Sequence, residues 1–173
     1  GASGAKAFAS LDLVVASGVD QEARITVDPT VHTTDHVEQL VARLRAEESH
    51  AEWRGGDQVG TTAEGKPILQ MPYPVYGEAA SRLMDLLYAC ELVVPFDWGS
   101  WLSASGVRAA GLPERPDVAD AVRFVTGIVR GERFCDGNVE AAIREGSLLR
   151  AIEAITNAVR STAPDAFGRS DGL

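Results

Sequence analysis

The chain has 173 residues, of which 45% are hydrophobic and 24% are charged, the usage of an ordinary globular domain with enough apolar side chains for one core. Sixteen basic and 25 acidic residues give a formal net charge of −9 at pH 7, which opposes binding to a phosphate backbone. Apolar stretches such as Leu92-Val93-Val94 are far shorter than the ~20 residues that a membrane span requires. We therefore expect a single soluble domain that binds neither nucleic acid nor a membrane directly.

Cysteine usage predicts the compartment. Cys90 and Cys135 are the only cysteines, and they do not form a spaced framework of the kind that disulfide-rich or zinc-binding domains carry. The first four residues, Gly-Ala-Ser-Gly, are typical of a trimmed end and show no charged stretch followed by an apolar one. We expect two reduced thiols in a cytoplasmic protein.

The first elements in chain order are a hairpin and a helix. Leu11, Leu13 and Val15 alternate as in a strand, although apolar residues of this segment would also fit one helix face. We expect a hairpin, because the β-branched stretch 24–27 supplies a second arm. An amphipathic helix is then predicted over about residues 35–50, where capping-box spacing precedes apolar residues at helical intervals.

The middle of the chain predicts a second hairpin. Residues 59–62 and 68–71 are rich in side chains that favour strands, and glycine and proline residues between them indicate a turn. Two prolines, Pro72 and Pro74, then restrict residues 73–76 to an extended path.

Several helices complete the chain. The first ends by Pro95, the second spans residues 98–110, and the third runs from Pro116 to Gly131. Two final helices are expected to begin at the N-caps Asn138 and Ser147. The apolar face of the first helix consists of Leu83, Leu86, Leu87 and Cys90, and that of the last consists of Leu148, Ile152, Ile155 and Val159.

The predicted fold class is α+β: a mainly helical single domain with one or two short antiparallel hairpins. Residues 1–34 would form an N-terminal segment with a β-hairpin, residues 35–160 a helical core domain, and residues 161–173 a frayed C-terminal tail.

Two histidines stand four residues apart, a spacing that can place two imidazoles on one helix face as metal ligands. His32 precedes the expected helix start, however, and His36 follows threonines and an aspartate that suit a solvated capping region. We expect no metal and no cofactor.

Cys135 lies near the predicted start of a helix, where backbone dipoles lower the pKa of a thiol, so it could serve as a nucleophile if a base such as His36 or His50 came close in space. The alternative is structural, with Phe134 and Cys135 filling the core while Asp136 caps the helix. The structural alternative is favoured, because free cysteine is among the most buried residue types.

A pair of carboxylates, Asp97 and Asp136, could converge and support general acid or base chemistry. A structural interpretation again covers both residues. Asp97 would be the N-cap of the helix that starts at Trp98, Asp136 a turn residue, and Arg133 or Arg130 their ion partner in a buried network.

Aromatic residues are concentrated in the middle of a chain that is otherwise poor in them. Such a cluster could line a ligand groove or a protein interface, or it could belong to the core. Its members are Trp53, Tyr73, Tyr76, Trp98 and Trp101.

Three strings taken together, QMPYPVY at 70–76, FDW at 96–98 and IVRGERFCDG at 128–137, resemble a family of small bacterial proteins catalogued as a domain of unknown function. The resemblance extends from about Trp53 to Ile155. It implies no reaction, cofactor or catalytic residue.

The functional expectation is a protein-interaction or regulatory module in which an acidic surface and the five aromatic residues bind a protein partner. The alternative is a small enzyme or small-molecule-binding protein with a site at Asp97, Arg133, Cys135 and Asp136. A nucleic-acid mimic is a third class, but no patterned acidic stripe supports it.

Overall fold

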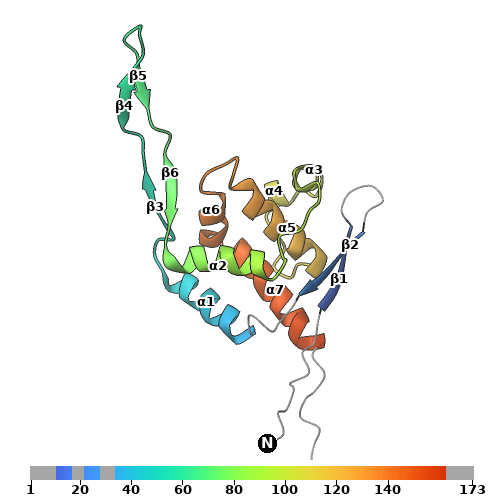
Figure 1. Ribbon diagram of the computed structural model, residues 1–173. Coiled ribbons are helices and arrows are strands. Elements are labelled where there is room, and N and C mark those ends of the chain that lie inside the picture. The colour runs from blue at the N-terminus through green and yellow to red at the C-terminus, as the bar shows by residue number, and fades with distance from the viewer. Residues whose placement is uncertain (1–10, 17–21, 28–33, 163–173) are drawn as a thin grey trace, which may run out of the picture.

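The computed structural model describes residues 11–16, 22–27 and 34–162, and over these it has the predicted class, mainly helical with antiparallel strand pairs (Figure 1). In chain order the elements are β1 (Leu11–Ala16), β2 (Glu22–Val27), α1 (Thr34–Ala46), β3 (Ala51–Arg54), β4 (Gln58–Thr61), β5 (Pro67–Leu69), β6 (Tyr73–Tyr76), α2 (Glu78–Ala89), α3 (Trp98–Ala104), α4 (Val107–Ala110), α5 (Val118–Gly131), α6 (Asn138–Arg144) and α7 (Ser147–Thr162).

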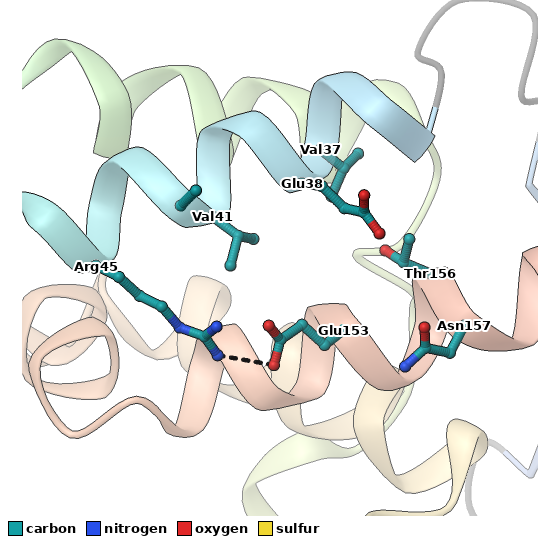
Figure 2. Close-up of a pocket in the computed structure, with 8 residues that line it drawn as sticks. Val37, Glu38, Val41, Arg45, Glu153, Thr156 and Asn157 are labelled. Carbon is teal, nitrogen blue, oxygen red and sulfur yellow. Dashed lines mark hydrogen bonds and ion pairs between the residues drawn. The ribbon is translucent and has the colours of Figure 1, made fainter.

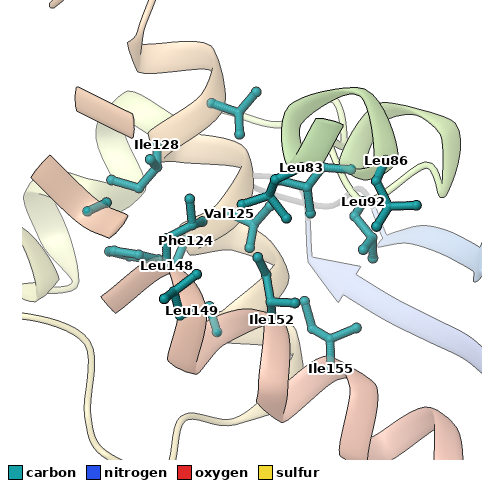
Figure 3. Close-up of a cluster of buried hydrophobic side chains, with 14 of the residues drawn as sticks. Leu83, Leu86, Leu92, Phe124, Val125, Ile128, Leu148, Leu149, Ile152 and Ile155 are labelled. Carbon is teal, nitrogen blue, oxygen red and sulfur yellow. The ribbon is translucent and has the colours of Figure 1, made fainter. Parts of the chain in front are cut away.

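The core lies between α2, α5 and α7, whose apolar side chains point toward one another (Figure 3). All four residues of the stripe predicted for the last helix are buried, as are the four predicted for the helix before Pro95. Burying one leucine or valine fully contributes about 1.5–3 kcal/mol, so these faces supply the main stabilisation of the helical body.

One buried polar residue fixes the segment between α2 and α3. The side chain of Thr126, on α5, is fully buried, and its hydroxyl donates to the Leu92 carbonyl at 3.1 Å and accepts from the Val94 amide at 3.1 Å. Because these backbone groups lie away from water, the threonine satisfies a donor and an acceptor that the loop cannot pair itself.

A long β ribbon, residues 51–76, projects from the helical body, and we call it the arm (Figure 1). At its base β3 pairs with β6, and at its far end β4 pairs with β5, both antiparallel. Two backbone hydrogen bonds between Gly56, Asp57 and Gln70 join the two strand pairs. Gly55 has a φ of +90°, and a Cβ there would lie 2.6 Å from the Met71 carbonyl oxygen, so only glycine fits where the ribbon bends.

The structure confirms the N-terminal hairpin and the second hairpin, and corrects several boundaries. Strand β1 pairs with β2 from Leu11 opposite Val27 onward. Helix α1 ends at Ala46 rather than near residue 50, and β3, which was not predicted, follows it. Residues 98–110 form two short helices instead of one, because Gly106 adopts a φ of +73° between them.

The predicted N-caps of the last two helices are wrong. Asn138 and Ser147 are the first helical residues of α6 and α7. The side-chain amide of Asn138 donates to the Ile128 carbonyl at 2.9 Å, and the Ser147 hydroxyl donates to the Ala142 carbonyl at 3.2 Å. The first bond joins α6 to α5 and the second joins α7 to α6. In the part of the chain that the structure describes, no helix is long and apolar enough to cross a membrane. The frayed tail was predicted over residues 161–173, but α7 continues to Thr162, and the rest of that stretch lies outside the described residues.

Candidate functional site

The turn between α5 and α6 anchors the arm to the helical body. Glu132 lies there, half-buried, and one of its carboxylate oxygens accepts from the Tyr76 hydroxyl at 2.6 Å and from the Gly137 amide at 2.7 Å. The other oxygen accepts from the Val139 amide at 2.7 Å. Glu132 therefore performs the work of an N-cap for α6 from outside the helix. Burial, together with the hydrogen bond to Glu132, raises the pKa of the Tyr76 phenol, so it remains a donor.

A second contact fixes the same end of the arm. The Trp53 indole donates to the Glu140 carboxylate at 2.8 Å, and its ring lies over Gly137. Gly137 has a φ of +87°, and a Cβ there would lie 2.4 Å from a ring carbon of Trp53. The arm thus docks through two aromatic residues against a turn whose glycine leaves room for one of them.

The five aromatic residues do not form the single cluster that the sequence suggested. Trp53 and Tyr76 face the body, whereas Tyr73 lies three residues from Tyr76 along the strand and so faces the opposite side of the ribbon. Trp101 packs edge-on against Phe96 at 6.3 Å beside the core, and Trp98 packs instead on Phe134, with ring centroids 6.0 Å apart.

The predicted network between Arg133 and the two acids is also absent. Asp97 is the N-cap of α3 as expected, and hydrogen bonds from the Ser100 side chain and backbone lower the pKa of its carboxyl. Arg133 and Asp136 are exposed, and among the described residues no ion pair joins either arginine, Arg130 or Arg133, to Asp97 or Asp136. Arg133 and Asp136 are both in contact with solvent, where a charged side chain needs no ion partner.

The structural prediction for Cys135 is wrong as well. Its side chain is exposed, and Phe134 is 81% exposed. The chain turns sharply between α5 and α6 with backbone hydrogen bonds from Phe134 and Cys135 to Gly131, which directs both side chains outward. Cys90 is the buried thiol.

We expect iodoacetamide to modify Cys135 in the native protein at close to the rate in urea, because alkylation requires an accessible thiolate and Cys135 is accessible. Cys90 is buried and should react only after unfolding. Mass spectrometry of tryptic peptides over a time course measures both rates. Protection of Cys135 equal to that of Cys90 would contradict the exposed turn.

Residues of the strings FDW at 96–98 and IVRGERFCDG at 128–137 come together in the structure, at a pocket of about 320 Å³. Four elements supply its walls: α2, α3, α5 and the turn after α5. The lining residues are Tyr88, Trp98, Arg130, Arg133 and Phe134. Gly131 lies beside the indole of Trp98, and a Cβ there would be in ordinary contact with the ring at 3.8 Å but only 2.9 Å from the side-chain nitrogen of Asn138. Two guanidinium groups and no carboxylate line the pocket, on a chain whose net charge is −9.

Two other hollows differ in chemistry. The groove between α1 and α7, about 460 Å³, carries charges that pair with one another, such as Arg45 with Glu153 at 2.8 Å (Figure 2). A larger hollow of about 680 Å³ lies on the other side of the Trp98 and Phe134 rings, and its charged lining residues are Glu145 and Arg150. Neither presents an excess of positive charge.

No metal centre is apparent among the described residues, which contain no group of three or more potential His, Cys, Asp or Glu ligands. His36 is exposed on α1, and His32 lies outside the described residues. His50 is buried beside Glu47, with 3.8 Å between its Nδ1 and the carboxylate.

Two residues were not identified from the sequence: Tyr88, which lines the pocket, and Glu132, which anchors the arm. Tyr88 gives a signal in hindsight, since it falls between the apolar positions Leu87 and Cys90 and so must leave the buried face of α2. Glu132 gives none, because its three hydrogen-bond donors come from residues 76, 137 and 139 and the first is distant in sequence.

Comparison with known proteins supplies a family without an activity. No curated protein and no solved structure matches the chain. A model described as "Family of unknown function (DUF6508)" matches residues 29–161, a longer stretch than the resemblance from Trp53 to Ile155. Because the match spans most of the chain, this protein belongs to the DUF6508 family of unknown function.

Proposed function

We propose that this protein is an interaction module whose arm binds another protein. The observation that carries the proposal is the distribution of exposed apolar side chains. Side-chain exposure is described for residues 36–107 and 110–161, and among these eight large hydrophobic side chains are exposed. Six of the eight lie on the arm, although the arm is a small part of the chain. Those six are Trp53, Val59, Ile68, Leu69, Met71 and Tyr73.

The construction of the arm supports this proposal. A ribbon of two strands has no core, and an isolated ribbon of this kind is marginally stable in water. Beyond the contacts of Trp53 and Tyr76, the far end of the arm packs against no helix, and Met71 is 79% exposed. Its strand edges also leave backbone groups unpaired. A partner that packs on the arm would bury its exposed apolar side chains and could pair with the backbone groups of its strand edges.

The charge of the arm favours a protein over other partners. Its charged residues are Glu52, Arg54, Asp57, Glu64 and Lys66, three acidic and two basic. Glu52 and Arg54 pair with each other at 3.0 Å. Nucleic acids and anionic membrane surfaces select clustered lysine and arginine, which this arm lacks. An apolar cleft on a folded protein matches its chemistry best.

The test places a photo-crosslinking amino acid at Leu69 on the arm and, as a control, at the exposed Asp85 on α2. We expect position 69 to give a discrete protein adduct in a lysate of the native host and position 85 to give none. An adduct of twice the chain's mass would identify a second copy as the partner.

With the identified partner, Leu69→Asp should weaken binding by about 2 kcal/mol or more, roughly thirtyfold, because it places a charge in an apolar contact. Gln39→Glu adds the same charge on α1 and should leave the affinity unchanged. Titration calorimetry measures both variants. Equal adducts from positions 69 and 85, or full affinity of Leu69→Asp, would overturn the proposal.

A further inference from the structure

We propose that the pocket between Tyr88, Trp98 and Phe134 binds a small planar aromatic anion, with a phosphate ester of nucleoside-monophosphate size as the best fit. This site is distinct from the arm, and the inference does not depend on the arm's function. Its volume of about 320 Å³ lies at the lower end of the range found for small-molecule sites.

The aromatic side chains account for the planar part of the ligand. The ring centroids of Trp98 and Phe134 lie 6.0 Å apart with the ring planes tilted by 33°, and Tyr88 lines the same pocket from α2. Phe134 is 81% and Tyr88 47% exposed, and among the residues whose side-chain exposure the structure describes they are the two large exposed hydrophobic residues outside the arm. Exposed rings that converge on one hollow offer faces on which an aromatic ring can stack, a contact worth about 1–3 kcal/mol for a base.

The two arginines account for the anionic part. Arg130 and Arg133 lie three apart across the end of α5, and neither forms an ion pair or a side-chain hydrogen bond with any described residue. By contrast Arg43, Arg45, Arg54, Arg82, Arg123, Arg144 and Arg160 all pair with carboxylates. Two unpaired guanidinium groups beside each other, with no lining carboxylate, form a site for a doubly charged phosphate more readily than for a singly charged carboxylate.

Two acids adjoin the residues of this site in sequence, and neither forms an ion pair with its arginines. Glu132 accepts hydrogen bonds from Tyr76 and two backbone amides, and Asp97 caps α3 through the Ser100 amide. On a strongly acidic chain, two guanidinium groups therefore line the same pocket as the exposed rings. A ligand with only one of the two features would leave either the rings or the guanidinium groups unused.

The experiment measures binding of AMP, GMP and phenyl phosphate by calorimetry and by the intrinsic tryptophan fluorescence, to which Trp98 in the pocket contributes. Adenosine, inorganic phosphate and indole-3-acetate are the comparison compounds. We expect the aromatic phosphates to bind, and adenosine and inorganic phosphate to bind at least about tenfold more weakly, because each lacks one of the two contacts.

Arg133→Gln and Phe134→Ala should each weaken AMP binding by about tenfold, and both side chains are exposed, so the fold should tolerate the changes. Arg115→Gln is the matched control, since Arg115 is exposed, lies outside the pocket and carries the same charge. Circular dichroism verifies folding of all three variants. The proposal is overturned if no aromatic phosphate binds, if Arg133→Gln binds AMP as the wild type does, if Arg115→Gln weakens binding equally, or if the carboxylate binds more tightly than the phosphates.

Discussion

Replacement of Glu132 by alanine should lower the free energy of unfolding by about 3–5 kcal/mol, although Glu132 belongs to a surface turn. The carboxylate accepts three hydrogen bonds of 2.6–2.7 Å, from the Tyr76 hydroxyl and from the Gly137 and Val139 amides. Hydrogen bonds to a charged group contribute about 1.5–3 kcal/mol each when buried, and the half-buried position reduces that sum. Alanine would leave all three donors without their acceptor and would remove one of the two contacts that fix the base of the arm, the other being that of Trp53 with Glu140.

The measurement is urea denaturation followed by circular dichroism. Asp136→Ala is the matched control, because it removes an exposed carboxylate from the same turn and should cost no more than about 0.5 kcal/mol. Tyr76→Phe removes one of the three donors, so its loss in free energy of unfolding should lie between those of Glu132→Ala and Asp136→Ala. If Glu132→Ala and Asp136→Ala destabilise the protein equally, the carboxylate does not anchor the arm.

Local patterns in the sequence predicted the helical body well, because each core helix carries its own apolar face. The stripe from Leu148 to Val159 and the face from Leu83 to Cys90 follow helical spacing, and packing of α2, α5 and α7 buries both. The hairpin turn in the arm was equally visible, since glycine and proline residues punctuate residues 60–67.

Long-range pairing was not visible in the sequence. Strand β3 has four residues, Ala51 to Arg54, and the last three are all exposed. No alternation of apolar and polar side chains therefore marked it as a strand. Its partner, β6, lies about twenty residues away beyond the β4–β5 turn. A strand whose identity depends on a distant partner has little local signal.

The candidate site was likewise predictable in part: its residues stood out locally, but their spatial arrangement did not. The sequence marked Trp98, Arg133 and Phe134 as unusual, and the structure brings them to one pocket. It could not show that the acids of the same strings, Asp97 and Asp136, turn away from the arginines. Spacing in sequence does not decide side-chain direction in a tight turn, where one positive φ, at Gly137, redirects the chain.

Gly137→Ala should lower the free energy of unfolding by about 2–4 kcal/mol, for two separable reasons. A left-handed φ, here +87°, costs an alanine about 1–2 kcal/mol. In addition, the new Cβ would lie 2.4 Å from one carbon of the Trp53 ring and 2.8 Å from another, so the indole must move and weaken its 2.8 Å hydrogen bond to Glu140. Urea denaturation measures the total.

Gly146→Ala separates the two costs. Gly146 also has a left-handed φ, +73°, but the nearest atom to its Cβ position is the tip of Arg150 at 3.7 Å, so this variant should show only the backbone cost. A double-mutant cycle with Trp53→Ala then isolates the contact, since removal of the indole should make Gly137→Ala no worse than Gly146→Ala. If Gly137→Ala already equals Gly146→Ala when Trp53 is present, the indole does not press on the turn, and close packing of Trp53 on Gly137 contributes nothing to the anchoring of the arm.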